Sequence, residues 1–245
     1  MHDPRISIIE ERLRDINKVV VVASGKGGVG KSLIASMLAL ALSKKGFKTG
    51  LFDIDFTSPT THIVLGVSNL QPKEDKGIIP PEIHGVKYMS LVFYIAEKAA
   101  PLRGSDLSNV LIELLAVTRW RKLDFLIIDM PPGISDLLLD VLKYVDKACF
   151  LVVTTPSKMA FETVRRLLTL LNDLEANVLG VIENMRIRES SYIEDEVKLL
   201  GKRFLGAIHF DEEIEDALGD VETLLKTKFM KELEEIIEKN QGIFH

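Results

Sequence analysis

The stretch GKGGVGKS, residues 25–32, decides the fold class of this chain. It matches the phosphate-loop pattern of glycine, four residues, glycine, lysine and serine. In such a loop the glycines let backbone N–H groups turn toward phosphate oxygens, and the amino end of the next helix adds positive potential. An apolar strand pattern over 18–24 precedes the loop and a helical pattern over 33–45 follows it. This context favours a nucleotide site over a chance glycine-rich turn.

Short apolar runs alternate with helical patterns along the rest of the chain. Strands are predicted at 18–24, 48–55, 86–92, 125–130, 148–155, 178–184 and 204–209, and helices at 33–45, 107–120 (capped by Ser105 or Asp106), 161–174 and 222–239. Near-continuous apolar strands that alternate with helices predict an α/β fold, with a mostly parallel sheet and helices on both faces. No linker or repeat interrupts the pattern, so we expect a single domain over 1–245, with 71–84 as a surface loop.

The composition limits the possible functions. The net charge of −5 argues against a general nucleic-acid binder. No apolar run approaches the roughly 20 residues of a membrane-spanning helix, and the amino-terminal segment lacks the apolar core of a signal peptide. We therefore expect a soluble, cytoplasmic protein without a nucleic-acid or membrane partner. The single cysteine, Cys149, lies in an apolar run, where a buried and inert thiol is expected.

Acidic residues end two of the predicted strands. Asp53 and Asp55 end one strand, and Asp129 ends another. Ligands of such sheets bind at the carboxyl ends of the strands, and carboxylates there suit Mg²⁺. Singly, each aspartate could be a turn or cap residue, but together with the loop they indicate hydrolysis of a nucleoside triphosphate. We expect Lys31 to reach the β- and γ-phosphates and Ser32 to bind Mg²⁺.

The lysine that begins KGGVGKS, Lys26, resembles the extra lysine in the deviant phosphate loop of the MinD/Mrp ATPases. In that group this lysine crosses a dimer interface and contacts the phosphates held by the other subunit. The match is closest to the Mrp/Nbp35 branch, although Ser58 stands where glycine is usual in the first switch. Blocks similar to that branch lie at 53–60 (DIDFTSPT), 100–104 (APLRG), 119–136, 151–166 and 180–185 (GVIENM). The resemblance implies a homodimeric ATPase that binds ATP and ADP with Mg²⁺.

The same resemblance implies roles for individual residues. Catalytic roles fall to Lys26, Lys31 and Asp55, and magnesium binding to Ser32, Asp53 and Asp129. The implied nucleotide-binding residues are Gly25, Lys26, Gly27, Gly28, Val29, Gly30, Lys31, Ser32, Leu33, Asn184 and Phe210. Asn184 would read adenine, which favours ATP over GTP, and Phe210 would pack on the base. His209 replaces the proline that is usual in this last segment.

The chain departs from the Mrp/Nbp35 pattern in one respect. Iron–sulfur members carry a Cys-x-x-Cys pair shortly after the ENM segment, and this chain has no cysteine there. Because cluster ligation needs thiolates, usually four, no iron–sulfur cluster is expected. In lacking this cysteine pair, the chain resembles the archaeal, Mrp-type HypB proteins of hydrogenase maturation. That resemblance implies an ATPase that assists nickel insertion into [NiFe] hydrogenase together with a HypA-like nickel metallochaperone.

Two other functions stay open at this point. One is an iron–sulfur cluster carrier of the Mrp/Nbp35 type that uses ligands from a partner. The other is a positioning ATPase of the MinD/ParA type. The predicted helix at 222–239 carries several glutamates, which disfavours binding to anionic lipid. The five histidines, at 2, 62, 84, 209 and 245, form no metal-binding tract.

Overall fold

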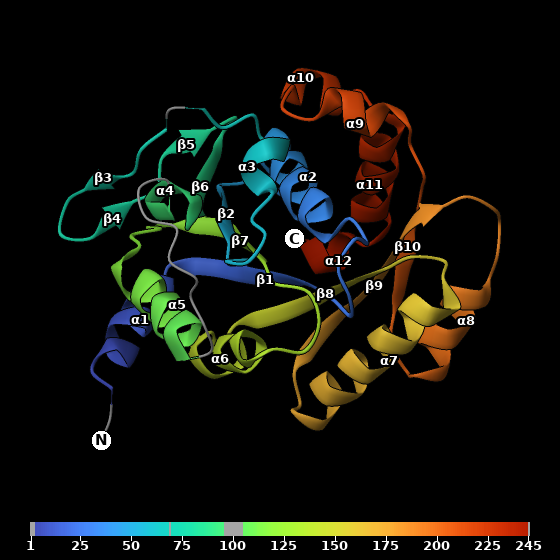
Figure 1. Cartoon of the computed structure of the whole chain (residues 1–245), viewed down its shortest axis with the longest axis horizontal. Coiled ribbons are helices and arrows are strands. Elements are labelled where there is room, and N and C mark those ends of the chain that lie inside the picture. Colours follow the sequence, from blue (N-terminus) through green and yellow to red (C-terminus); the bar gives the residue numbers. More distant parts are fainter. Residues whose placement is uncertain (1–2, 69, 96–104, 245) are drawn as a thin grey trace.

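The computed structural model describes residues 3–68, 70–95 and 105–244. The motif block at 100–104, His2 and His245 lie outside these residues. The strands of the main sheet are β1 (Ile16–Ser24), β2 (Thr49–Asp53), β5 (Glu82–Ile83), β6 (Val86–Ser90), β7 (Leu123–Asp129), β8 (Ala148–Thr154), β9 (Asn177–Arg186) and β10 (Phe204–His209). Their order across the sheet is β10-β9-β8-β1-β7-β2-β6-β5 (Figure 1). Every neighbouring pair is parallel except β5 and β6.

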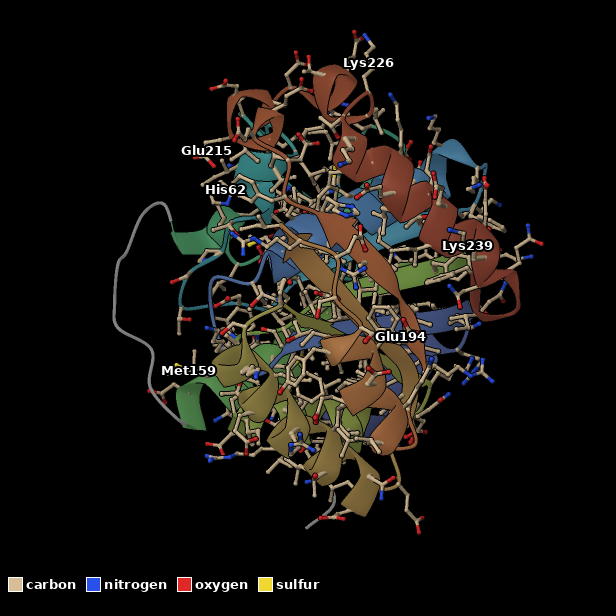
Figure 2. The ribbon with its side chains drawn as sticks, turned by 90° about the vertical axis from the view of Figure 1, so that its right-hand side faces the viewer. His62, Met159, Glu194, Glu215, Lys226 and Lys239 are labelled. Carbon is tan, nitrogen blue, oxygen red and sulfur yellow. The ribbon has the colours of Figure 1, made fainter. Side chains whose placement is uncertain are left out.

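Helices cover both faces of this sheet. One face carries α2 (Lys31–Lys44), α3 (Thr61–Val64), α9 (Glu213–Ala217), α10 (Val221–Leu224), α11 (Lys228–Lys239) and α12 (Gln241–Phe244). The other face carries α1 (Arg5–Leu13), α5 (Ser105–Val117), α6 (Asp136–Tyr144), α7 (Lys158–Asp173) and α8 (Tyr192–Leu199), and α4 (Val92–Ile95) follows β6. Figure 2 shows the two layers from the side, with Lys226 and Lys239 in one and Met159 and Glu194 in the other. The predicted α/β fold with a mostly parallel sheet is confirmed.

Burial of the central strand β1 on both faces explains why the predicted strands are apolar along most of their length. Its side chains alternate between two cores, with Val19 and Val21 in one and Val20 and Val22 in the other, and all four are fully buried. Successive residues of a strand point to opposite faces, so a strand that is covered on both faces needs apolar side chains throughout. The same burial extends through β7 and β8 except at the second residue of each strand, which is half-buried.

Several predicted boundaries were wrong. The helix predicted at 222–239 is two helices, α10 and α11, because the side chain of Thr227 accepts a hydrogen bond from the Met230 N–H and begins a new helix. Helix α5 begins at Ser105, so both proposed cap residues lie inside its first turn. The strand expected at 86–92 ends at Ser90.

The segment predicted as a surface loop at 71–84 contains short strands. They are β3 (Lys73–Glu74) and β4 (Ile78–Ile79), which pair with each other, and β5. Cys149 is half-buried rather than buried, and burial raises the pKa of its thiol. Among the described residues, no helix is both long enough and apolar enough to span a membrane.

Candidate functional site

The phosphate loop connects β1 to α2 at the carboxyl edge of the sheet. Gly28 and Gly30 have φ angles of 75° and 80°, in the left-handed region that glycine adopts without a steric penalty. Gly30 is the cap of α2, so the helix begins at Lys31 with its free N–H groups facing the loop. A Cβ on Gly25 would lie 2.4 Å from Thr163 Oγ1 and 2.5 Å from its carbonyl carbon. The loop therefore packs directly against α7.

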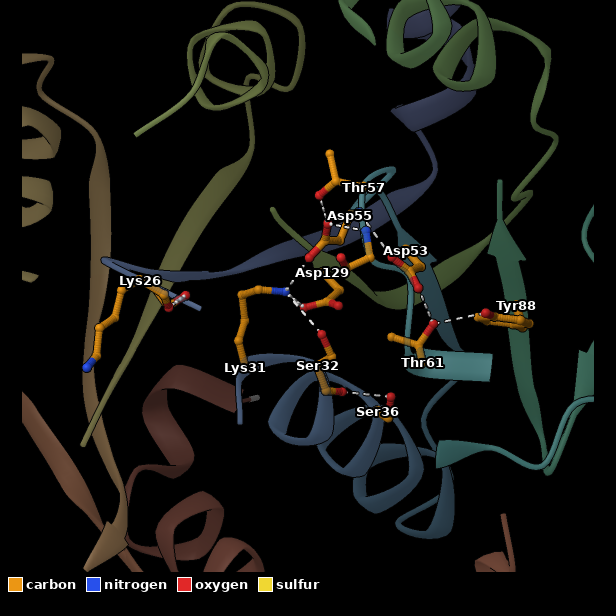
Figure 3. Close-up of polar contacts among 12 residues, drawn as sticks. Lys26, Lys31, Ser32, Ser36, Asp53, Asp55, Thr57, Thr61, Tyr88 and Asp129 are labelled. Carbon is orange, nitrogen blue, oxygen red and sulfur yellow. Dashed lines mark hydrogen bonds and ion pairs between the residues drawn. The ribbon is translucent and has the colours of Figure 1, made fainter. Parts of the chain in front are cut away.

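Lys31 lies among buried oxygen atoms at the start of α2 (Figure 3). Its Nζ donates hydrogen bonds to Asp129 Oδ1 at 2.6 Å and to Ser32 Oγ at 3.1 Å, and it lies 3.9 Å from Asp55 Oδ2. Lys31 is 6% exposed and Asp129 is fully buried. A buried carboxylate requires such a partner, because an unpaired charge is poorly solvated in the interior.

The register of parallel strands brings the acidic residues together. Asp53 is paired with Asp129 across β2 and β7, so both strands end side by side. Asp55 follows two residues later, and its backbone N–H donates to Asp53 Oδ1 at 3.0 Å. Asp55 Oδ1 accepts hydrogen bonds from Thr57 Oγ1 at 2.8 Å and from the Ser58 N–H at 3.1 Å. These contacts hold the Asp55 carboxylate next to Lys31.

Two hydroxyl groups that sequence reasoning missed complete this cluster. Thr61 donates to Asp53 Oδ2 at 2.5 Å, and Thr61 Oγ1 lies 2.9 Å from the Tyr88 hydroxyl. Burial, reinforced by the nearby Asp129, raises the pKa of Asp53 to about 7. Burial also raises the pKa of Asp129, against the opposing effect of Lys31. Tyr88 stands in a mostly apolar segment, whereas Thr61 lies among other polar residues, so no local pattern marks Thr61.

The oxygen donors at this edge fit magnesium. Asp129 Oδ2 is buried and has no hydrogen-bond partner within the described residues, although Oδ1 is bonded to Lys31. The Ser32 hydroxyl is beside it, and both are the hard oxygen ligands that Mg²⁺ prefers. Both Asp53 oxygens already accept hydrogen bonds, so Asp53 suits a supporting role. In the described parts of the chain, no group of three or more His, Cys, Asp or Glu residues could hold a metal alone.

A cavity of about 150 Å³ brings together Asn184 and Phe210, which were predicted to contact the base, and Leu33, which was predicted to bind the nucleotide. Asn184 is 1% exposed, and its Nδ2 donates to the Val29 carbonyl at 2.9 Å. Asn184 therefore also fixes the phosphate loop. Phe210 is 53% exposed, so one side of its ring is accessible.

His209 lines the same cavity, and its ring lies between two carboxylates. Its Nδ1 is 2.9 Å from Glu232 Oε1, and its Nε2 is 3.1 Å from Glu189 Oε1. The sequence marked this position only as a missing proline. The contact with Glu232 could not be predicted, because that residue lies on α11, 23 residues further along the chain.

Lys26 lies in the same loop as Lys31 but points away from the acidic cluster (Figure 3). Its side chain is exposed, and its ammonium forms no hydrogen bond or ion pair with any described residue. Only its carbonyl is engaged, as acceptor from Ser24 Oγ at 2.9 Å. The ammonium of Lys31 therefore lies in the buried acidic cluster, whereas the ammonium of Lys26 is exposed and faces away from that cluster.

Comparison with known proteins extends these observations. Residues 15–241 match the ParA-type family described as NUBPL iron-transfer P-loop NTPase. The chain is 39% identical over 180 residues to an iron-sulfur cluster carrier protein of Pseudomonas fragi, covering 71% of this chain and 62% of that protein. It is 34% identical over 220 residues to another of the same name from Aquifex aeolicus, covering 83% of this chain and 60% of the relative. The chain thus spans less than two thirds of the length of these carriers.

Other similar proteins include a shorter relative and solved structures. The chain is 38% identical over 182 residues to the cytosolic Fe-S cluster assembly factor Nubp2 homolog 2 of Drosophila yakuba, covering 71% of this chain and 70% of the relative. A nucleotide-binding protein of Archaeoglobus fulgidus, solved with ADP, has a TM-score of 0.76 at 27% identity, covering 90% of this chain and 93% of that one. The cell division ATPase MinD of Pyrococcus furiosus, with a TM-score of 0.64 at 23% identity over 91% of this chain and 99% of its own, shares the fold.

Replacing Gly30 by alanine should destabilise the protein more than replacing Gly28. Both residues have positive φ, but only at Gly30 would the new Cβ lie 2.2 Å from Asn184 Nδ2, whereas nothing lies within 4 Å at Gly28. We expect Gly30→Ala to lower the free energy of unfolding by about 1 kcal/mol or more beyond Gly28→Ala. Urea denaturation of both variants measures the difference, and equal losses would contradict the packing of Asn184 against the loop.

Replacing Asp53 by asparagine should change how stability depends on pH. The folded-state pKa of about 7 exceeds the ordinary value of 3.8, so the folded protein binds this proton more tightly than the unfolded chain. The contribution of Asp53 to stability is thus fully present below about pH 4 and is lost as the pH rises through about 7. Asp53→Asn removes this loss, and its stability relative to wild type should rise by on the order of 1 kcal/mol between about pH 5 and pH 8.

Denaturation curves at both pH values test this expectation. Asp146→Asn, at an exposed position, is the matched control and should show no such pH-dependent gain. A gain for Asp53→Asn that is the same at both pH values would rule out a raised pKa.

Proposed function

The chain belongs to the family of NUBPL iron-transfer P-loop NTPases, and we propose that it is an ATP-dependent switch protein in iron–sulfur cluster assembly. The observation that carries this proposal is the family match over residues 15–241, supported by relatives named as iron-sulfur cluster carriers. The names of these relatives favour this function over nickel insertion into hydrogenase, which the missing cysteine pair had suggested.

The residues around the phosphate loop support ATP hydrolysis. Lys31 is buried beside Asp129 and Asp55, and its ammonium is the group in this cluster that can neutralise phosphate charge. Asp55 is held in place by Thr57 and Ser58, which suits it to orient the attacking water and accept its proton. Magnesium, held by Ser32 with support from Asp129 and Asp53, would neutralise the charge on the transferred phosphoryl group.

The exposed position of Lys26 supports a site that is completed by a second copy of the chain. Its ammonium is exposed and contacts no described group of its own chain. A cation in this position is available to the phosphates of a nucleotide bound by a second copy. Supplying that charge from a partner would couple hydrolysis to dimerisation. The ATP-bound form would then be a homodimer.

The cysteine content bears on where a cluster would be held. The chain has one cysteine, so two copies supply two thiolates, and clusters usually need four. Cys149 is also half-buried near the amino end of β8, whereas the phosphate loop lies at the carboxyl edge. We therefore propose that a partner protein supplies the cluster ligands and that this chain supplies the ATP-dependent switch.

Replacing Lys26 by alanine should separate nucleotide binding from hydrolysis. Because the side chain is exposed, ATP affinity should stay within about twofold, while the hydrolysis rate falls roughly 100-fold or more. Steady-state ATPase rates and equilibrium binding of ATP measure the two effects. Lys73→Ala, an exposed lysine on β3, is the control and should leave both unchanged. Full activity of Lys26→Ala would exclude the proposed role.

Anaerobic reconstitution tests the assignment of the cluster ligands. The isolated protein, supplied with iron and sulfide, should gain no stable cluster absorbance, and Cys149→Ala should behave like wild type. A cluster-loaded iron–sulfur scaffold protein should bind the chain with ATP and dissociate with ADP. Stable cluster binding that Cys149→Ala abolishes would place ligands in this chain. ATP-dependent binding to a nickel metallochaperone, without binding to iron–sulfur proteins, would restore the nickel function.

A further inference from the structure

A cavity of about 500 Å³ lies at the edge of the sheet opposite the phosphate loop. It is lined by residues at the amino ends of three strands, Thr49 and Leu123, which begin β2 and β7, and Lys87, the second residue of β6. Because β2 is five residues long, Thr49 at this cavity and Asp53 at the nucleotide site occupy its two ends. The cavity is therefore separate from the site described above.

Positive charge dominates the lining of this basal cavity. Four basic side chains line it, Lys48, Lys87, Arg121 and Lys122, together with the single acidic side chain of Glu82. This balance is opposite to that of the whole chain, which has 36 acidic and 31 basic residues. Such a concave cluster of one sign raises the local concentration of ions of the opposite sign.

These four cations are not paired within the described part of the protein. None of their charged side-chain nitrogens lies within 4.0 Å of a carboxylate oxygen, although the Lys48 backbone N–H donates to Asp124 Oδ2 at 2.8 Å. The neighbouring lysines at the end of α2, in contrast, are paired with α11. Lys44 lies 3.1 Å from Glu234, and Lys45 lies 2.9 Å from Glu238. The unpaired cations thus gather at the cavity, next to two that are neutralised.

Lys87 is the most enclosed of the four. It is half-buried, and its Nζ donates a hydrogen bond to the carbonyl of Trp120. Burial lowers the pKa of Lys87 and the positive charge of Arg121 lowers it further; Glu82 raises it by less than Arg121 lowers it, and Lys48 adds the smallest lowering. An anion in the cavity would relieve this repulsion and offset the cost of burying the ammonium.

The turn before β7 places two consecutive cations at the cavity. Arg121 has a φ angle of 58°, a left-handed conformation that disfavours residues with a side chain. Glycine or asparagine would adopt it more easily, yet an arginine stands there with Lys122 next to it. Strained conformations of this kind cluster at binding sites.

We propose that the basal cavity binds a small anion that carries two or more phosphate or carboxylate groups. Its volume of about 500 Å³ lies within the range of roughly 300–1,000 Å³ that is typical of small-molecule sites. Arginine suits phosphate and carboxylate alike, because its guanidinium can donate two parallel hydrogen bonds to either. The site does not depend on the proposed role in iron–sulfur assembly.

Calorimetric titration of the full chain tests this site. The protein is first saturated with ADP and magnesium, so that the phosphate loop cannot bind the probe. Fructose 1,6-bisphosphate is the phosphate probe and citrate is the carboxylate probe, each titrated at constant free magnesium. We expect saturable binding of at least one probe, and the double substitution Arg121→Gln/Lys122→Gln should weaken it by roughly tenfold or more. Added salt should also weaken it.

A matched control separates a built site from general attraction. Lys44→Gln/Lys45→Gln removes the same charge close by, from lysines that are paired with α11, and should leave binding unchanged. Binding of only one probe identifies the ligand as a phosphate or a carboxylate. Absence of saturable binding for both probes, or equal weakening by the two double substitutions, would overturn the proposal. ATP hydrolysis is measured in parallel, so failure here is distinguishable from failure of the ATPase assignment.

Discussion

The buried ion pair between Lys31 and Asp129 is the interaction on which the nucleotide site depends. It joins the first residue of α2 to the last residue of β7, and these two residues are 98 positions apart along the chain. The pair forms because β7 lies between β1 and β2, so Asp129 ends beside the phosphate loop. A shift of β7 by one residue would turn its side chains to the opposite faces of the sheet and break the pair. The register of β7 therefore determines whether the ion pair between Lys31 and Asp129 can form.

Strand β2 lies beside β7 and connects the two ends of the sheet. Its carboxyl end supplies Asp53, which accepts hydrogen bonds from the Asp55 N–H and from Thr61, and Thr61 also contacts Tyr88 of β6. Its amino end borders the basal cavity. The acidic cluster of the nucleotide site and the basal cavity thus lie at opposite ends of one short, fully buried strand.

Local sequence patterns predicted the phosphate loop, the buried strands and the aspartates at their ends, because each depends on a few adjacent residues. Helices α1, α6 and α8 were missed, since each is short and buries only two or three apolar side chains. The helix predicted at 222–239 is interrupted at Thr227, because the side chain of Thr227 caps the start of α11. Thr61, Tyr88 and the contact of His209 with Glu232 depend on pairing between distant segments, which one sequence does not reveal. The basal cavity could not be predicted for the same reason, because its cations come from three segments that are distant in the sequence.

If Lys26 completes the nucleotide site of a second copy, two inactive variants should restore activity when they are mixed. The most direct measurement mixes two inactive variants, Lys26→Ala and Asp55→Asn, and follows ATP hydrolysis. In a mixed dimer, the Lys26→Ala subunit retains Asp55 and receives Lys26 from its partner, so one site is complete. An equal mixture should recover about a quarter of wild-type activity, because about half of the dimers are mixed and each has one working site. If both variants are inactive alone and the mixture stays inactive, Lys26 does not act across a dimer.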